Sequence, residues 1–250
     1  MKSNTGRSRL DVVLVERGLA ESRQKAQAMI LAGEVRVDGA RAEKAGIPVS
    51  RDARIEVNSR LQKYVGRGGF KLEGALEDFS VDPRGLVCLD VGSSTGGFTD
   101  CLLQHGAARV YAVDVNTAQL DWKLQEDPRV VRIERNARRL KPEDIPERAG
   151  LVVVDVSFIS VTKLLGPVIA CAEQGATFLI LVKPQFELRR EDVGRGGIVK
   201  DTRLHEKAIA SVSKAAENAG LTSLEVRPSH LLGAEGNQEY FLHARKEALE

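Results

Sequence analysis

Short apolar runs alternate with amphipathic stretches along the chain from Gly85 onward. The apolar runs predict buried strands at Leu86–Val91, Arg109–Asp114, Val130–Ile133, Leu151–Val156, Thr177–Val182, Ser223–Arg227 and Tyr240–Ala244. The stretches between them predict helices at Gly97–His105, Ala118–Glu126, Val161–Cys171 and Asp201–Ala219. Strands that alternate with helices indicate a mostly parallel sheet covered on both faces. The expected fold class is therefore α/β, with a seven-stranded sheet whose last strand is antiparallel.

Residues 8–57 have a different pattern, which predicts a small separate unit. Apolar positions indicate a short helix that ends at Gly18 and a second helix, capped by Ser22, that ends at Gly33. Short strands are predicted at Val35–Val37, which leads into a tight turn, and at Ile55–Val57. The predicted organisation is a small α+β domain over residues 1–58, a linker over 59–69 and the α/β domain over 70–250, which opens with a helix from Phe70.

The composition is that of a chain that folds without disulfide bonds or a structural metal ion. Of the 250 residues 42% are hydrophobic, which is enough for a packed core. Three cysteines, Cys88, Cys101 and Cys171, are odd in number and far apart, which argues against a disulfide framework and against a zinc site. The four histidines are scattered, so no metal site is expected. Without a signal sequence or a long apolar run, we expect a cytoplasmic protein that does not span a membrane.

Positive charge is concentrated at the front of the chain. The net charge is only +2, but residues 1–72 carry 15 Lys and Arg against 8 Asp and Glu, and residues 73–250 carry 22 against 27. A basic segment followed by a mildly acidic remainder indicates a nucleic-acid-binding region joined to a region with a second activity. A solvated basic face without a partner is the alternative.

The run LVCLDVGSSTGGFTD at Leu86–Asp100 carries the most specific signal. An apolar strand ends in Asp90, and a small-residue turn opens at Gly92, at the place where α/β sheets bind nucleotide-like ligands. A dinucleotide fingerprint, G-x-G-x-x-G, needs a glycine where this chain has Ser94, so the turn is not built around a diphosphate. It resembles instead the first motif of S-adenosylmethionine (SAM) methyltransferases, in which backbone amides hold the methionine end of SAM. A glycine-rich turn of an ordinary doubly wound domain is the alternative.

Acidic and amide side chains follow the next two predicted strands. Asp114 ends the second strand, 22 residues after Gly92, where a carboxylate can accept hydrogen bonds from a ribose. Asn136 follows the third strand and is placed to reach an adenine. NAD and SAM both contain a ribose, so Asp114 indicates a nucleoside ligand without choosing between them. The candidate cofactor-binding residues are Asp90, Gly92, Ser93, Ser94, Gly96, Gly97, Asp114 and Asn136.

Two further polar residues follow the central strands. Asp155 ends the fourth strand, and Lys183 follows the apolar run FLILV of the fifth. Both are expected at the carboxyl edge of the sheet, where open α/β sheets keep their active sites. The Lys183 ammonium is expected to be partly desolvated, with Asp155 beside it to orient the amine.

The front unit resembles a known RNA-binding domain. The run SRQKAQAMILAGEVRVDG carries most of a resemblance to the S4 domain, whose basic helix face and following turn contact RNA phosphates. Arg9-Leu10-Asp11 also resembles the R-L-D of pseudouridine synthases, but it opens the predicted first helix and lies outside any catalytic domain. The basic loop Glu187–Lys200, which is expected to be flexible, follows the fifth strand and could clamp an RNA backbone. A plain solvated loop is the alternative. The candidate RNA-binding residues are Arg9, Arg23, Lys25, Arg36, Arg67, Arg189, Arg190 and Arg195.

Five ordered motifs extend the resemblance over nearly the whole chain. They are YVGRGGFKL, DVGSSTGGFTD, VDVSFIS, LVKPQFE and GNQEYF. Within them Lys71, Asp155, Lys183 and Glu239 stand in the order of the Lys-Asp-Lys-Glu tetrad of FtsJ-like ribose 2′-O-methyltransferases, and with the S4-like front end they closely resemble the TlyA family. This resemblance implies a Rossmann-like SAM methyltransferase domain, SAM as cofactor, and ribosomal RNA or ribosomal subunits as substrate.

Three other functions are considered. The first is an RNA-binding or ribosome-binding factor without catalysis, which the intact tetrad argues against. The second is a membrane-acting hemolysin, because the TlyA family was first described under that name; the chain has no apolar segment that supports it. The third is an NAD oxidoreductase, which fails on Ser94. The sequence does not indicate which nucleotide is methylated or whether the protein is an oligomer.

Overall fold

The computed structural model consists of two compact units, Met1–Lys63 and Tyr64–Glu250. It describes residues 7–20, 22–31, 33–50, 52–57, 63–233 and 236–247, with only the backbone at Arg195. The domain boundary predicted after residue 58 falls outside the described residues. Within the second unit, Tyr64 is buried and its ring meets that of Phe70 edge-on, with 5.1 Å between centroids. The segment from Tyr64 therefore packs with the second unit, and the helix predicted from Phe70 begins earlier, at Gly68.

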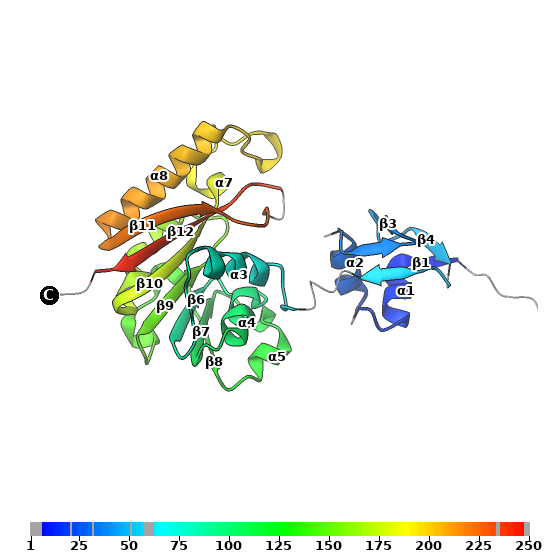
Figure 1. The fold of residues 1–250 in the computed structure, drawn as a ribbon, viewed down its shortest axis with the longest axis horizontal. Coiled ribbons are helices and arrows are strands. Elements are labelled where there is room, and N and C mark those ends of the chain that lie inside the picture. Colours follow the sequence, from blue (N-terminus) through cyan, green and yellow to red (C-terminus); the bar gives the residue numbers. More distant parts are fainter. Residues whose placement is uncertain are drawn as a thin grey trace, which may run out of the picture. The chain divides into compact units, whose positions relative to one another are not determined.

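The described residues of the first unit form two helices and five very short strands, and Figure 1 shows this unit. Leu10, Leu14 and Ile30 form its core together with Val35 and Val49. The predicted helices and strands are confirmed, but three of the strands are too short to leave a pattern in the sequence. The elements are β1 (Arg7–Arg9), α1 (Leu10–Glu16), α2 (Arg23–Leu31), β2 (Val35–Val37), β3 (Ala40–Arg41), β4 (Pro48–Ser50) and β5 (Ile55–Val57).

The local signals of this unit act as predicted. The Ser22 hydroxyl accepts a hydrogen bond from the Lys25 amide at 3.2 Å, which caps the start of α2. Gly18 and Gly33 follow the two helices with positive φ, a backbone conformation that glycine adopts without strain.

The second unit is built on one seven-stranded sheet in the order β11-β12-β10-β9-β6-β7-β8. Its strands from β10 to β8 are parallel, and β12 is antiparallel to both of its neighbours. The predicted α/β fold class is confirmed. The strands are β6 (Val87–Val91), β7 (Arg109–Asp114), β8 (Val130–Glu134), β9 (Ala149–Val154), β10 (Ala172–Val182), β11 (Leu221–Pro228) and β12 (Tyr240–Lys246).

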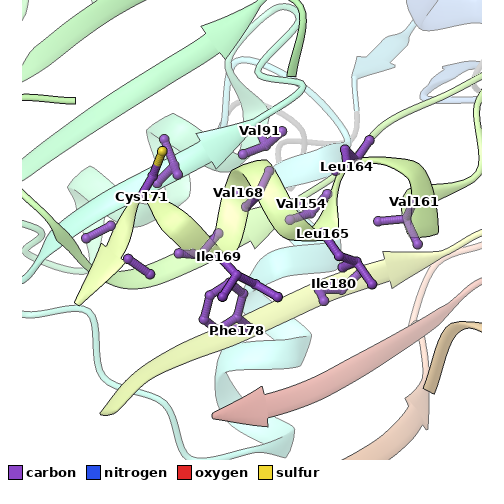
Figure 2. Packing of buried hydrophobic residues seen from close by; sticks show 14 of the residues in the cluster. Val91, Val154, Val161, Leu164, Leu165, Val168, Ile169, Cys171, Phe178 and Ile180 are labelled. Atoms are coloured by element: carbon purple, nitrogen blue, oxygen red, sulfur yellow. The ribbon is translucent and has the colours of Figure 1, made fainter. Parts of the chain in front are cut away.

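Alternate residues of each strand point to opposite faces of the sheet. Apolar side chains therefore lie on both faces, and helices cover both. On one face, Phe178 and Ile180 of β10 pack in a cluster with Leu165 and Val168 of α6 (Figure 2). On the other face, Leu179 of β10 belongs to a cluster built with helices α3, α4 and α5. The α-helices are α3 (Gly68–Asp78), α4 (Gly97–Gln104), α5 (Trp122–Gln125), α6 (Leu165–Ala170), α7 (Pro184–Glu187) and α8 (Thr202–Asn218).

Two predicted helices are each broken into a 3₁₀ turn and a short α-helix. The helix predicted over Ala118–Glu126 is interrupted at Asp121, whose amide donates to the Thr95 carbonyl at 3.0 Å and whose side chain caps α5. The helix predicted over Val161–Cys171 is interrupted before Leu165, because Pro167 lacks the N–H that would bond to Lys163. The 3₁₀ turns are η2 (Thr117–Gln119), η3 (Ala137–Arg139), η4 (Pro142–Asp144), η5 (Val161–Lys163) and η6 (Arg195–Gly197).

Candidate active site

The glycine-rich loop that follows β6 lies directly against the end of β9. The amides of Gly92 and Ser93 both donate to the Val113 carbonyl, at 2.8 and 3.1 Å, which ties the loop to β7. Gly92 has a φ of +87°, and a Cβ there would lie 2.2 Å from the backbone oxygen of Asp155. Only glycine satisfies both conditions, so the tight turn predicted from the sequence is enforced by a backbone contact.

Two polar atoms beneath this loop are left unpaired. Asp90 Oδ1 and Ser93 Oγ are buried and have no hydrogen-bond partner among the described residues. Asp90 Oδ2 accepts a 2.6 Å hydrogen bond from the Thr99 hydroxyl. Burial raises the pKa of the Asp90 carboxyl to about 7, and the negative charges of Asp155 and Asp114 add to the shift. A buried carboxylate held in this way is suited to a cationic ligand group such as the ammonium of an amino acid.

A cleft of about 540 Å³ opens beside the loop. This volume lies within the range of roughly 300–1,000 Å³ that is usual for small-molecule sites. The lining includes Gly92, Ser94, Asp114, Asn136 and Asp155. The structure therefore brings together residues that the sequence placed after four different strands.

Further contacts of the predicted cofactor residues fix the conformation of the glycine-rich loop and its packing against helices. The Ser94 amide donates to Asp114 Oδ2 at 2.9 Å, and Ser94 itself has a left-handed backbone with φ +48°. Gly97 faces the start of α3, where a Cβ would lie 3.0 Å from the Gly69 amide nitrogen. A Cβ on Gly96 would lie 2.2 Å from Leu124 of α5. These two glycines allow close packing of helices and do not have to touch a ligand.

Two buried ion pairs stand at the same edge of the sheet. Lys183 Nζ lies 2.5 Å from Asp155 Oδ1 and donates to the Ser157 hydroxyl at 3.0 Å. Lys71, on α3, pairs with Glu239, which precedes β12. Both lysines and Glu239 are buried, so their charges are offset by their partners and not by water. The tetrad is thus arranged as two lysine–carboxylate pairs.

Strand register brings the two pairs to one place. In the antiparallel ladder of β10 and β12, Val182 lies opposite Tyr240. Lys183, which follows Val182, and Glu239, which precedes Tyr240, therefore lie next to each other just beyond the end of the ladder. Asp155 continues β9, the parallel neighbour of β10. Elements that are 168 residues apart in the sequence, α3 and the start of β12, meet here through Lys71 and Glu239.

Comparisons with known proteins identify the family of the chain. The FtsJ-like methyltransferase family model matches residues 64–246, and the S4 domain model matches residues 8–55. A TlyA protein of Mycobacterium tuberculosis, named 16S/23S rRNA (cytidine-2′-O)-methyltransferase, is 48% identical over 96% of this chain and 90% of its own. The chain belongs to the TlyA family of FtsJ-like methyltransferases. Its cofactor is S-adenosylmethionine.

Other members of the TlyA family have hemolysin names. Hemolysin A of Brachyspira hyodysenteriae is 43% identical over 94% of this chain and 98% of its own. A solved structure from Streptococcus thermophilus with a provisional hemolysin name is 37% identical, has a TM-score of 0.77, and covers 97% of this chain and 90% of its own. Among the described residues of this TlyA-family protein, no helix is long and apolar enough to cross a membrane.

The predicted RNA-binding residues of this TlyA-family protein lie in three places. Arg9, Arg23, Lys25 and Arg36 belong to the S4 unit. Arg67 precedes α3 and lines a smaller cleft of about 150 Å³ beside the glycine-rich loop, so it lies at the cofactor side of the methyltransferase unit. Arg189 and Arg190 are exposed on a surface hollow of about 530 Å³, and the side chain of Arg195 lies outside the described residues.

The basic loop predicted to be flexible is fastened at its far end. The buried side chain of Asn237 accepts from the Val199 amide at 2.9 Å and donates to the Gly197 carbonyl at 2.9 Å. His205 bonds to the Val199 carbonyl at 2.8 Å. Asn237 lies two residues before Glu239. The segment that binds the end of the basic loop therefore also carries one residue of the tetrad.

One exposed residue was missed in the sequence. Phe158 is 91% exposed, lines both the 540 Å³ cleft and the 530 Å³ hollow, and has a positive φ of +65°. Its ring lies 5.3 Å from that of Phe186. A bulky residue in a left-handed conformation is an outlier that concentrates at functional sites. In the sequence, only its place inside the VDVSFIS motif could have indicated this residue.

The place of Asp114 on the cleft predicts a measurable effect on cofactor affinity. Asp114→Ala is expected to weaken SAM binding by about 1–3 kcal/mol, because a carboxylate that accepts ribose hydroxyl groups makes charge-assisted hydrogen bonds. Calorimetric titration of SAM checks this, with Asp127→Ala, a carboxylate outside the residues that line the cleft, as the matched control. Unchanged affinity in a folded Asp114→Ala protein would reject the assignment.

Proposed function

We propose that this protein transfers the methyl group of SAM to the 2′-hydroxyl of a ribose in ribosomal RNA. The observation that carries the proposal is the pair of lysine–carboxylate contacts, Lys71–Glu239 and Lys183–Asp155, at the edge of the sheet where Asp155 lines the larger cleft. The names of the relatives support ribosomal RNA as substrate, and the S4 unit supports a grip on RNA. A protein with this substrate would act where ribosomes are, in the cytoplasm.

The reaction needs an oriented and deprotonated hydroxyl. When bound, SAM would supply a methyl group on a positively charged sulfur; the carbon–sulfur bond would break as the ribose oxygen bonds to the methyl carbon, and S-adenosylhomocysteine would be the leaving group. Lys183 is held by Asp155 and Ser157 at a fixed position. From there its amine orients the 2′-hydroxyl and, in the form that has first lost a proton to solvent, takes the hydroxyl proton. Lys71, held by Glu239, stabilises the oxyanion as it forms. Because both amines are prepositioned, much of the acceleration comes from orientation.

The cofactor is assigned to the residues that follow β6, β7 and β8. Asp90 and Ser93 would bind the methionine amine through the atoms that are now unpaired. Asp114 would accept the ribose hydroxyl groups, and Asn136 would reach the adenine, since both line the larger cleft. Gly92 provides the close approach of backbone to ligand.

RNA is assigned to the basic residues of both units. Arg9, Arg23, Lys25 and Arg36 of the S4 unit would contact phosphates, which provide affinity without reading sequence. Arg189 and Arg190 would hold the backbone beside the tetrad, since they line the hollow next to Phe158. Arg67 and Arg195 are kept as further candidates.

The test is methyl transfer to ribosomal particles. Purified large and small ribosomal subunits from cells without this protein are incubated with the enzyme and tritiated SAM, and the modified position is mapped by its resistance to alkaline cleavage. Label on a ribose 2′-oxygen is expected. Binding to subunits without any label would support the non-catalytic alternative, and release of dye from liposomes by the purified protein would support a hemolysin.

Phe158 is expected to stack on an RNA base beside the reacting ribose. Stacking of a base on an aromatic side chain contributes about 1–3 kcal/mol. Phe158→Ala is therefore expected to raise the activation free energy calculated from kcat/KM for ribosomal subunits by about 1–3 kcal/mol. SAM affinity, measured by calorimetry, stays unchanged. Trp122→Ala is the matched control, because Trp122 is also an exposed aromatic residue, on α5. Equal losses in the two variants would contradict the role of Phe158.

A further inference from the structure

The S4 unit contains a buried carboxylate that binds two of its surface arginines. Asp11, in the first turn of α1, accepts from Arg9 Nε and Nη2, both at 3.0 Å, and from Arg23 Nη2 at 3.3 Å. Gln27 Nε2 adds a fourth hydrogen bond at 2.8 Å. Arg9 is the last residue of β1, and Arg23 and Gln27 lie on α2. One carboxylate therefore connects three elements.

Burial separates the roles of the three charged groups. The Asp11 side chain is 0% exposed, whereas those of Arg9 and Arg23 are 53% and 58% exposed. The carboxylate is unable to meet RNA, and both guanidinium groups are able to. A guanidinium has five N–H donors, of which Asp11 takes two from Arg9 and one from Arg23. Each arginine keeps donors for a phosphate.

The two cations depend on the carboxylate between them. Two guanidinium groups close to one anion repel each other, and Asp11 offsets that repulsion. The hydrogen bond from Arg9 is the main reason that the pKa of the Asp11 carboxyl lies well below its usual range. The carboxylate is therefore ionised at every pH at which RNA binding is measured. Arginine side chains otherwise rotate freely, and that freedom would be lost on binding.

We propose that Asp11 is a positioning residue that holds Arg9 and Arg23 as a paired grip for RNA phosphates. This inference rests on the proposed function, since it takes these two arginines as RNA contacts. Asp11 itself touches no RNA. It fixes the direction of both guanidinium groups before the substrate arrives, so the cost of ordering them is met during folding and not during binding.

Simple electrostatics and the positioning role predict opposite signs for one substitution. Asp11→Asn removes a negative charge from a surface that binds an anion, so charge alone predicts tighter RNA binding. Loss of positioning predicts weaker binding by about 5- to 150-fold, the sum for two side chains that must be ordered. Glu43→Gln is the matched control, because it removes one exposed carboxylate of the same unit. The control is expected to change affinity by less than about twofold or to tighten it.

The experiment measures affinity for purified large and small ribosomal subunits with full-length protein. Asp11→Asn is made in the wild-type chain and in Arg9→Gln/Arg23→Gln, which closes a double-mutant cycle. Asp11→Asn is expected to weaken binding in the wild-type chain and to cause no further loss in the Arg9→Gln/Arg23→Gln chain. Circular dichroism and SAM affinity are measured on each variant to show that it is folded.

Equal or tighter binding by folded Asp11→Asn would overturn the proposal, as would the same loss in both backgrounds. Where Asp11→Asn does not fold, Gln27→Met removes one hydrogen bond from the carboxylate without a change of charge. It is expected to weaken binding about two- to tenfold, and unchanged affinity would overturn the proposal. Failure of the wild-type protein to bind or methylate subunits would count against the proposed function, which separates the two failures.

Discussion

Lys183→Ala is expected to abolish methyl transfer while the fold and SAM affinity remain. The Lys183 amine is the group that would orient the 2′-hydroxyl and take its proton, and such a contribution is typically about 10²–10⁴-fold in rate. Lys183 lies at the end of β10 with its Nζ 2.5 Å from Asp155. The measurement is tritiated methyl incorporation into ribosomal subunits, with circular dichroism and calorimetry of SAM as controls.

Lys183→Arg separates proton transfer from simple charge. A guanidinium keeps the positive charge and hydrogen-bonding capacity, but it is not deprotonated in proteins. It is therefore expected to restore little activity. Turnover of Lys183→Arg close to the wild-type rate would contradict a base at this position, and would leave Lys183 with an electrostatic role. Lys163→Arg, the same change on a lysine of the neighbouring hollow, is the matched control.

The second large effect concerns the pair Lys71–Glu239. Both side chains are buried, so Glu239→Ala leaves an ammonium without a partner in the core. The expected cost is about 3–5 kcal/mol of unfolding free energy, the usual result of breaking a buried ion pair by removing one member. Asp155→Asn, in the more exposed pair with Lys183, is expected to cost less. Urea unfolding of the full-length protein measures both.

A double substitution tells structure from catalysis at this pair. Lys71→Met with Glu239→Leu replaces the pair by apolar side chains, which is often neutral for stability. The double variant is expected to regain most of the unfolding free energy and none of the methyl transfer. A stable double variant that still methylates ribosomal subunits would remove Lys71 and Glu239 from the mechanism.

The strands and the glycine-rich loop could be predicted because their signals are local. The run that ends at Val91 is apolar in sequence and buried in the sheet, and the glycine at position 92 follows it directly. The break at Asp121 was missed because it depends on a distant partner, whereas the break before Leu165 follows from Pro167, a local signal that the helix prediction did not use. Asp121 leaves the helical path to bond to Thr95, and the contact of Leu120 with the Gly96 region adds to this.

The members of the candidate site and the closeness of Asp155 to Lys183 could be predicted, but not the pairing of Lys71 with Glu239. Motif order indicated Lys71, Asp155, Lys183 and Glu239, and the carboxyl ends of the strands indicated where two of them lie. The assignment of Glu239 to Lys71 depends on the register of β12 against β10, to which no local pattern is sensitive. Phe158 was missed for a similar reason, since exposure beside a cleft is a property of the folded surface.

The position of β12 has a consequence for synthesis of the protein. This strand follows the other six strands of the sheet in chain order, and yet it lies inside the sheet, between β10 and β11 (Figure 1). A nascent chain therefore has an open slot in its sheet and lacks Glu239 until residues 239–246 have left the ribosome. A premature stop codon anywhere before Glu239 is expected to produce a protein without the Lys71 partner and with β11 detached from the sheet. Truncation just before Glu239 thus removes both an inner strand of the sheet and the partner of Lys71.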